Sequence, residues 1–233
     1  MGPLQLNIAE AISAIRQCNA SAEFRAAERL MHAQFHAPDS TDAESIAERV
    51  VLLDRLWATQ MFWHRGLIDR VIDSLHIHAP RLLDTIRALP PDALEDSPDL
   101  ILDAARVAMP IALARTSPQE PGGPYSFATK YLHWMTRLHF PIMDGRARLA
   151  INNLQRQSGH KPRIPTSSLD WFDDYPRWIA FYSDLTRSIA QSQREQLIEI
   201  DTESQPSPGR CRNSLLRVLD KVFYTLGSAP AAT

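Results

Sequence analysis

The chain has 233 residues, of which 44% are hydrophobic and 22% charged, a composition typical of globular proteins. Its formal net charge of −2 at pH 7 gives no global reason to expect nucleic-acid binding. Its two cysteines, Cys18 and Cys211, are too few for a cysteine-rich zinc or iron–sulfur site and do not suggest a secreted disulfide scaffold. Because we find neither a signal-peptide pattern nor an apolar run of membrane-spanning length, we expect a cytoplasmic protein without membrane contact.

The first half of the chain shows a succession of apolar stripes at helical spacing. Thr41 or Asp42 can cap the longest of these helices, and Glu44, three residues after Thr41, fits a capping box. Pro98 suits the first turn of the last helix of this half. The helices predicted here span residues 6–17, 20–35, 46–63, 67–78, 80–89 and 98–115.

A loop rich in proline and glycine, 116–124, leads into a helix that begins near Tyr125 and places Lys130 in its second turn. The residue before a proline is pushed out of the helical region, so 140–143 is predicted to be extended. Asp144 then stands where its side chain can accept hydrogen bonds from the first N–H groups of another helix. The apolar face of the Lys130 helix consists of Phe127, Tyr131, Trp134 and Leu138.

The rest of the chain also follows a helical pattern. A basic, irregular segment, 158–168, is followed by a helical stretch over 169–200 that we expect to be interrupted near Pro176. A polar linker, 204–209, precedes a final amphipathic helix over 210–226. With no alternating strand pattern and no internal repeat, the predicted fold is all-α, with about ten helices.

Two stretches carry a more specific pattern. Leu52-Leu-Asp-Arg-Leu-Trp-Ala-Thr-Gln60, followed by Ile68-Asp-Arg-Val-Ile72, resembles the early segment of helix–hairpin–helix DNA glycosylases, where a buried helix ends in a polar turn that enters the DNA. Phe140-Pro-Ile-Met-Asp144, preceded by Lys130, resembles their catalytic part, in which a lysine begins the second hairpin helix and a Val-Asp approach leads into the next helix. The similarity covers roughly residues 46–155 and is closest to the 8-oxoguanine DNA glycosylase-like branch.

This resemblance implies a two-lobed helical bundle formed as a single domain by residues 1–233. Residues 46–155 would form the glycosylase-like core, and the helices of 1–45 and 156–233 would complete the second lobe. It implies a monomeric DNA base-excision glycosylase, with or without lyase activity at abasic sites, that acts on double-stranded DNA carrying a modified base and needs no cofactor or metal.

The implied chemistry uses two side chains. Lys130 would be the nucleophile, since a lysine amine that is partly deprotonated can attack C1′ and form a Schiff base. The apolar neighbours Tyr131 and Trp134 would favour the neutral amine. Asp144 would stabilise the cationic sugar as the bond to the base breaks, or assist proton transfer.

Further residues are candidates for DNA contact. The target base must leave the helical stack, and aromatic side chains commonly hold it once it is extruded. Gln60 is the candidate wedge that fills the resulting gap. The candidates for the base pocket are Phe62, Trp63, Trp134 and Trp171. The candidates for phosphate contact are Gly122, Gly123, Arg146, Arg148, Lys161 and Arg163, most of them in a local basic segment.

The sequence also departs from the family pattern. The family usually has Gly-x-Gly just before the lysine, whereas Ala128 and Thr129 precede Lys130 here. The spacing from Lys130 to Asp144 is also shorter than usual. Either the hairpin is rebuilt around 121–124, or the phosphate contact is weaker. The absence of a four-cysteine cluster excludes the iron–sulfur branch.

Each candidate has a structural alternative. Lys130 can be a solvated helix lysine, Asp144 only an N-cap, and Gln60 the end of a helix. The tryptophans Trp57, Trp134 and Trp178 fit a hydrophobic core. His133 and His139 lack a third metal ligand at suitable spacing, and no nucleophile motif supports them as the base of a hydrolase. The competing function is a non-catalytic helical module that binds DNA or another protein.

Overall fold

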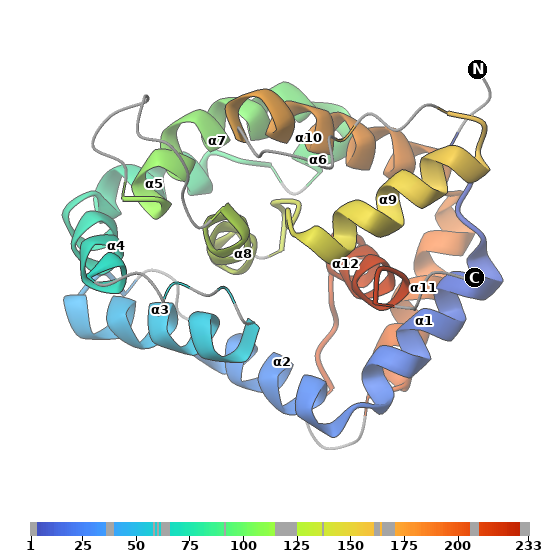
Figure 1. Cartoon of the computed structure of the whole chain (residues 1–233), viewed down its shortest axis with the longest axis horizontal. Coiled ribbons are helices and arrows are strands. Elements are labelled where there is room, and N and C mark those ends of the chain that lie inside the picture. Colours follow the sequence, from blue (N-terminus) through green and yellow to red (C-terminus); the bar gives the residue numbers. More distant parts are fainter. Residues whose placement is uncertain are drawn as a thin grey trace. The chain divides into compact units, whose positions relative to one another are not determined.

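The computed structural model describes residues 4–35, 40–57, 59, 61, 66–90, 92–114, 125–136, 138–160, 164, 171–205 and 210–228. Within these ranges the chain forms twelve helices and no strand (Figure 1), which confirms the all-α prediction for this part of the protein. The number exceeds the predicted ten or so because a short helix, α6 (Ala93–Asp96), was not expected and because residues 169–200 form two helices. None of these helices is long and apolar enough to cross a bilayer.

The chain divides into two compact units. Residues 1–29 and 141–233 form the terminal unit, and residues 30–140 form the central unit. The terminal unit is therefore built from both ends of the chain. The boundary between the units falls once inside α2 (Ala22–Gln34) and once just before the extended segment that leads to Asp144.

The central unit is organised around α7 (Pro98–Ala112), which packs against α4, α5, α6 and α8. Four of the buried residues of α7 are alanines: Ala104, Ala105, Ala108 and Ala112. The other helices of this unit are α3 (Ala43–Trp57), α4 (Leu67–Ile77), α5 (Ala79–Arg87) and α8 (Tyr125–Met135). α8 is buried on nearly all sides, including its polar residues Lys130 and His133, so the predicted single apolar face underestimates its burial.

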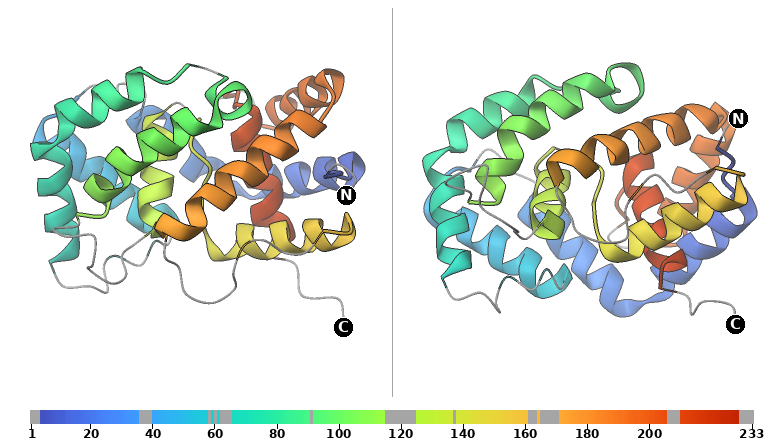
Figure 2. Two further views of the ribbon diagram at one scale, coloured as in Figure 1. Left: turned by 90° about the horizontal axis from the view of Figure 1, so that it is seen from above. Right: turned by 45° about the horizontal axis from the view of Figure 1, so that its top comes forward.

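The terminal unit is organised around α12 (Leu215–Leu226). This helix packs against α1 (Ile8–Ala20), α9 (Gly145–Gln157) and α11 (Gln191–Glu203), and its contacts with α1 and α9 can be followed in Figure 2. α10 (Trp171–Ser188) adds an aromatic contact, because the ring centroids of Tyr182 and Phe223 lie 5.7 Å apart.

Several helix ends differ from the prediction. At the start of α3, the Asp42 alternative of the two predicted caps is confirmed, because its side chain accepts from the Ser45 N–H at 2.8 Å. α3 ends at Trp57, whereas the predicted helix continued to Trp63, and Thr59 lies outside it. Pro98 begins α7 as predicted.

The predicted interruption at Pro176 is wrong. Pro176 lies inside α10, where a proline near the start of a long helix removes a single backbone hydrogen bond. The break falls instead at Ala190, whose extended backbone (φ −60°, ψ 148°) begins α11. The predicted final helix also begins later, at Leu215, where Ser214 caps it.

Candidate functional site

Lys130 lies in the second turn of α8, and only 6% of its surface is exposed. The solvated-lysine alternative is therefore wrong. Its Nζ donates a hydrogen bond to the Trp57 carbonyl oxygen at 3.3 Å. Trp57 is the last residue of α3, where carbonyl groups lack partners within the helix and the helix dipole is negative. Lys130 thus joins the carboxyl end of α3 to α8.

Aromatic side chains surround this part of α8. The ring of Trp134 lies 6.3 Å from that of Trp57 and 6.2 Å from that of Phe35, and the ring of His32 meets it edge-on at 5.0 Å. Trp134 is only 3% exposed. Its position fits the alternative that it belongs to the hydrophobic core, and its role in a base pocket stays a prediction.

His133 connects α8 to the segment that follows. Its ring is fully buried, and its Nδ1 lies 2.6 Å from the Phe140 carbonyl oxygen. The Leu138 N–H donates to the His133 carbonyl oxygen at 2.7 Å, and Leu138 has a φ of 72°, which is uncommon for leucine. These contacts give His133 a structural role at the end of α8.

In the terminal unit, residues 141–144 have no regular secondary structure before α9, as predicted. The Tyr175 hydroxyl donates to the Pro141 carbonyl oxygen at 3.0 Å. Asp144 has an extended backbone (φ −138°, ψ 171°), and its Oδ1 accepts from the Ala147 N–H at 2.8 Å. Asp144 is therefore the N-cap of α9, and its side chain is half-buried.

The charge of Asp144 also acts inside the terminal unit. The pKa of the Tyr182 phenol is raised well above its usual value, first by burial and then by the negative charges of Asp220 and Asp144. Tyr182 is fully buried on α10. The tyrosine therefore remains neutral over the ordinary pH range, and the charge near it is that of the carboxylates.

The start of α9 also carries two predicted phosphate contacts. Arg146 is exposed and Arg148 is half-buried, both within the first turns after Asp144. The Arg146 guanidinium lies over the Tyr224 ring, 4.6 Å from its centroid. At Gly227, just past α12, a Cβ would stand 2.0 Å from the Arg146 carbonyl oxygen, so only glycine fits there.

The structure thus groups the described candidates into two sets. Lys130 and Trp134 lie on α8 of the central unit, whereas Asp144, Arg146 and Arg148 lie at the start of α9 in the terminal unit. Of Trp171 only the backbone is described, as the first residue of α10. The other candidates lie outside the described residues: Gln60, Phe62, Trp63, Gly122, Gly123, Lys161 and Arg163.

A buried carboxylate at the end of α3 was not predicted from the sequence. Asp54 is 5% exposed, and its Oδ1 accepts from the Thr59 hydroxyl at 2.5 Å and from the Met61 N–H at 2.9 Å. It lies inside the Leu52–Gln60 stretch of the resemblance. Its only signal in the sequence is an aspartate among apolar residues of a helix.

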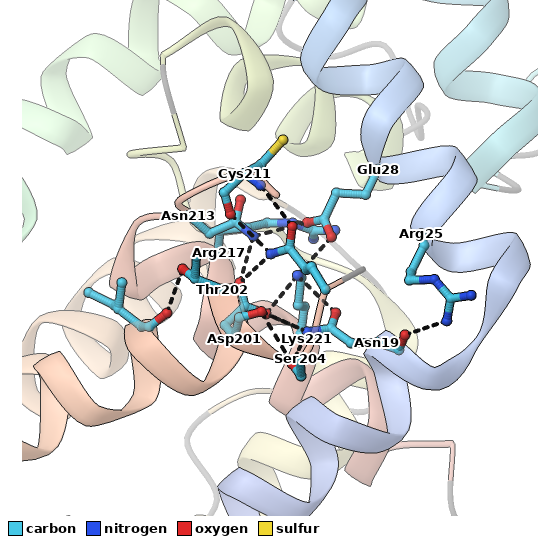
Figure 3. A network of polar contacts seen from close by, with 12 residues as sticks. Asn19, Arg25, Glu28, Asp201, Thr202, Ser204, Cys211, Asn213, Arg217 and Lys221 are labelled. Carbon is cyan, nitrogen blue, oxygen red and sulfur yellow. Dashed lines mark hydrogen bonds and ion pairs between the residues drawn. The ribbon is translucent and has the colours of Figure 1, made fainter. Parts of the chain in front are cut away.

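A second unpredicted feature is a cluster of buried charges in the terminal unit (Figure 3). Lys221 Nζ lies 2.7 Å from Glu28 Oε2 and 2.7 Å from Asp201 Oδ1. Arg217 pairs with Glu28 at 3.0 Å and also with Asp220. We call these five residues the ion cluster. They join α2, α11 and α12.

Amide side chains add further hydrogen bonds to the ion cluster. Asn19 donates to Asp201 Oδ1 at 3.0 Å, and Asn213 donates to Asp201 Oδ2 at 2.8 Å. Lys221, Arg217 and Asp201 each have a relative exposure of 0%. A substrate cannot reach fully enclosed groups, so we assign the ion cluster a role in stability. Within the described ranges no group of three or more His, Cys, Asp or Glu side chains is placed to hold a metal ion.

Comparisons with known proteins give no relative: no family model, no curated protein and no solved structure matches the chain.

Proposed function

We propose that this protein is a DNA base-excision glycosylase with the two-lobed helix–hairpin–helix fold. It would act on double-stranded DNA that carries a modified base. The observation that supports this most is the local structure of residues 125–157. A helix with a buried lysine, an irregular crossing and an aspartate-capped helix follow one another in the order that the resemblance implies.

In the proposed reaction the Lys130 amine attacks C1′ of the modified nucleoside. The bond between C1′ and the base breaks, its electron pair leaves with the base, and the base takes up a proton. The C1′–O4′ bond then breaks, and O4′ keeps its electron pair and takes up a proton. The nitrogen loses two protons, which balance those gained by the base and by O4′, and its lone pair forms the double bond of a Schiff base between Nζ and C1′. The Asp144 carboxylate stabilises the positive charge that develops on the sugar.

The other lysines of the chain are poorer candidates for the nucleophile. The sequence contains three lysines: Lys130, Lys161 and Lys221. Lys221 is fully enclosed between Glu28 and Asp201 and cannot reach a nucleotide. Lys161 lies in the basic segment, where we propose that it contacts phosphate.

One observation favours the second candidate function, a non-catalytic helical module that binds DNA or another protein. Lys130 already has a structural use, because it donates to the carbonyl group at the end of α3. For catalysis, that hydrogen bond must be released when the substrate binds. Two substitutions separate the alternatives. Lys130→Gln keeps an N–H donor for Trp57 and lacks a nucleophilic amine, whereas Lys130→Met lacks both.

The test is incubation with duplexes that carry different modified bases, followed by borohydride reduction. A glycosylase that uses Lys130 gives a trapped covalent complex with at least one duplex, and neither variant gives it. The structural alternative predicts no trapping by the wild type with any duplex. It also predicts a lower unfolding free energy for Lys130→Met than for Lys130→Gln. Trapping by Lys130→Gln at the wild-type level would contradict the proposal.

A further inference from the structure

The end of α12 lies directly on a peptide group at the start of α9. The two helices pack side by side in the terminal unit (Figure 1). At Gly227, the residue that follows α12, a Cβ would stand 2.0 Å from the Arg146 carbonyl oxygen and 2.6 Å from its carbonyl carbon. Non-bonded carbon atoms prefer a separation of roughly 3.5 to 4 Å. The Gly227 backbone and this peptide group therefore meet with no room for a side chain between them.

The need for glycine at position 227 comes from the available space and not from the backbone conformation. Glycines that follow a helix commonly have a left-handed backbone, which other residues adopt at a cost. Gly227 instead has φ −76° and ψ −10°, values that most residue types adopt readily. The atoms that a Cβ would meet belong to the backbone of Arg146, which cannot turn aside as a flexible side chain can. An added side chain must therefore displace the start of α9.

The peptide group in contact with Gly227 is also the one that holds Asp144. It joins Arg146 to Ala147, and its N–H, which belongs to Ala147, donates to Asp144 Oδ1 at 2.8 Å. A peptide group is rigid and planar, so its carbonyl oxygen and its N–H move together. A displacement of the Arg146 oxygen away from α12 therefore also moves the donor that fixes the Asp144 carboxylate.

A second residue of α12 contacts the side chain of Arg146. The Arg146 guanidinium lies over the Tyr224 ring, 4.6 Å from its centroid, and Tyr224 stands about one helical turn before Gly227. Such a contact between a cation and an aromatic face is attractive. The end of α12 thus contacts Arg146 both at its backbone and at its side chain, and these contacts fix the first turn of α9 from outside that helix.

We propose that Gly227, together with Tyr224, is a positioning residue for Asp144. The missing side chain at Gly227 lets the 146–147 peptide group hold the Asp144 carboxylate in the place that the proposed reaction requires. This inference rests on the proposed function, since it takes the charge of Asp144 as part of the reaction. Neither Gly227 nor Tyr224 touches the reacting atoms, and both act through Arg146.

The test measures single-turnover base excision and DNA affinity on the duplex that gives the trapped complex. Gly227→Ala should slow excision about 10- to 100-fold, the usual effect of misplacing a reacting group by about 1 Å. Its affinity for the duplex should stay within about twofold of the wild type. Gly145→Ala is the matched control, because Gly145 directly follows Asp144 and an added Cβ there meets nothing within 4 Å. This variant should keep the wild-type rate.

A double-mutant cycle separates positioning from general stability. Asp144→Asn keeps an oxygen that can cap α9 and loses the charge. If Gly227 acts through that charge, Gly227→Ala should slow excision by less than about twofold in the Asp144→Asn background, because residues that act through one another are not additive. If the two losses of rate multiply instead, Gly227 does not act through Asp144, and the proposal is wrong.

Tyr224 keeps the test decisive if Gly227→Ala does not fold. Tyr224→Leu removes the ring next to the Arg146 guanidinium and should slow excision, whereas Tyr224→Phe keeps the ring and should retain the wild-type rate. A folded Gly227→Ala, or in its place Tyr224→Leu, that excises as fast as the wild type would overturn the positioning role alone. A wild type that excises no base from any duplex would overturn the proposed function, and this inference with it.

Discussion

At the scale of a single residue, Asp144 has one observed role and one proposed role, and substitutions can separate them. Its carboxylate caps α9 through Ala147, and in the proposed reaction its charge stabilises the sugar cation. Asp144→Asn and Asp144→Ser both keep an oxygen that can cap and both lose the charge. We expect each to raise the barrier to base excision by about 3 kcal/mol, the scale of one well-placed electrostatic group.

Stability provides the control for Asp144. The two capping variants should unfold with nearly the wild-type free energy, whereas Asp144→Ala should lose about 1 kcal/mol together with the cap. Single-turnover excision and urea unfolding measure the two effects. If Asp144→Ser excises the base as fast as the wild type, Asp144 is only a cap.

A second prediction at this scale concerns Cys18. Burial raises the pKa of its thiol from 9.0 to about 12, with the nearby positive charges of Arg217 and Lys221 acting in the opposite direction. The folded state thus keeps a proton that the unfolded state loses above pH 9. The contribution of the protonated Cys18 thiol to stability is therefore complete below pH 9. As the pH rises toward 12, the unfolding free energy falls by on the order of 4 kcal/mol.

Cys18→Ala should therefore flatten the decline of the unfolding free energy between pH 9 and pH 11. The half-buried Cys211, whose pKa burial also raises, is the matched comparison, and Cys211→Ala should change the slope less. The readout is urea unfolding as a function of pH. If the unfolding free energy of Cys18→Ala declines with pH as steeply as that of the wild type, other groups cause the loss of stability at alkaline pH.

At the scale of the element, local signals in the sequence predicted every helix of the described ranges except the short α6. Apolar spacing indicated α7 and α8, Pro98 the start of α7, and Asp144 the cap of α9, because each of these signals acts within a few residues. The end of α3 and the break at Ala190 were missed. In the structure, the Met61 N–H donates to Asp54 Oδ1 after the end of α3, and the Ala190 N–H donates to Gln193 Oε1 at the break.

The ion cluster could not be predicted for a related reason. Arg217 and Lys221 look like the polar face of an amphipathic helix, yet both are fully buried in α12. Their partner Glu28 stands 189 residues from Arg217 in the sequence. No local pattern indicates a pairing over such a distance, so the sequence analysis predicted only an amphipathic helix here.

This cluster gives the element-scale prediction. Lys221→Met removes the cation between Glu28 and Asp201 and leaves two buried carboxylates close to each other. We expect a loss of about 3–5 kcal/mol in unfolding free energy, the usual effect of breaking a buried ion pair. Denaturant unfolding measures the loss.

An exposed ion pair supplies the matched control. Arg106 and Asp103 pair at 2.6 Å on α7 with side chains 62% and 66% exposed, and Arg106→Ala should cost less than about 1 kcal/mol. If Lys221→Met and Arg106→Ala lose a similarly small unfolding free energy, the ion cluster contributes little to the stability of the terminal unit.

At the scale of the whole molecule, the net charge of −2 means that the proposed DNA binding would depend on a local basic region. We expect Arg148, Lys161 and Arg163 to contribute to it. Replacing all three with glutamine should weaken binding and reduce the slope of log affinity against log salt by about 2 to 3, since each phosphate contact contributes about 0.9. Titrations by fluorescence anisotropy at several salt concentrations would show this.

The control replaces three exposed arginines of the central unit, Arg70, Arg81 and Arg106, and keeps the total charge change the same. The salt slope of this variant should match that of the wild type. If the two triple variants lose the same affinity and slope, the basic segment around α9 is not the DNA-binding region.

The attachment site of the reduced DNA adduct tests the central claim most directly. Borohydride-trapped protein can be digested and the modified peptide identified by mass spectrometry. The chain offers only three lysines, so the assignment is unambiguous. Attachment to Lys130 is the predicted result. Attachment to Lys161 or to the amino-terminal amine would contradict the assignment of Lys130 as the nucleophile.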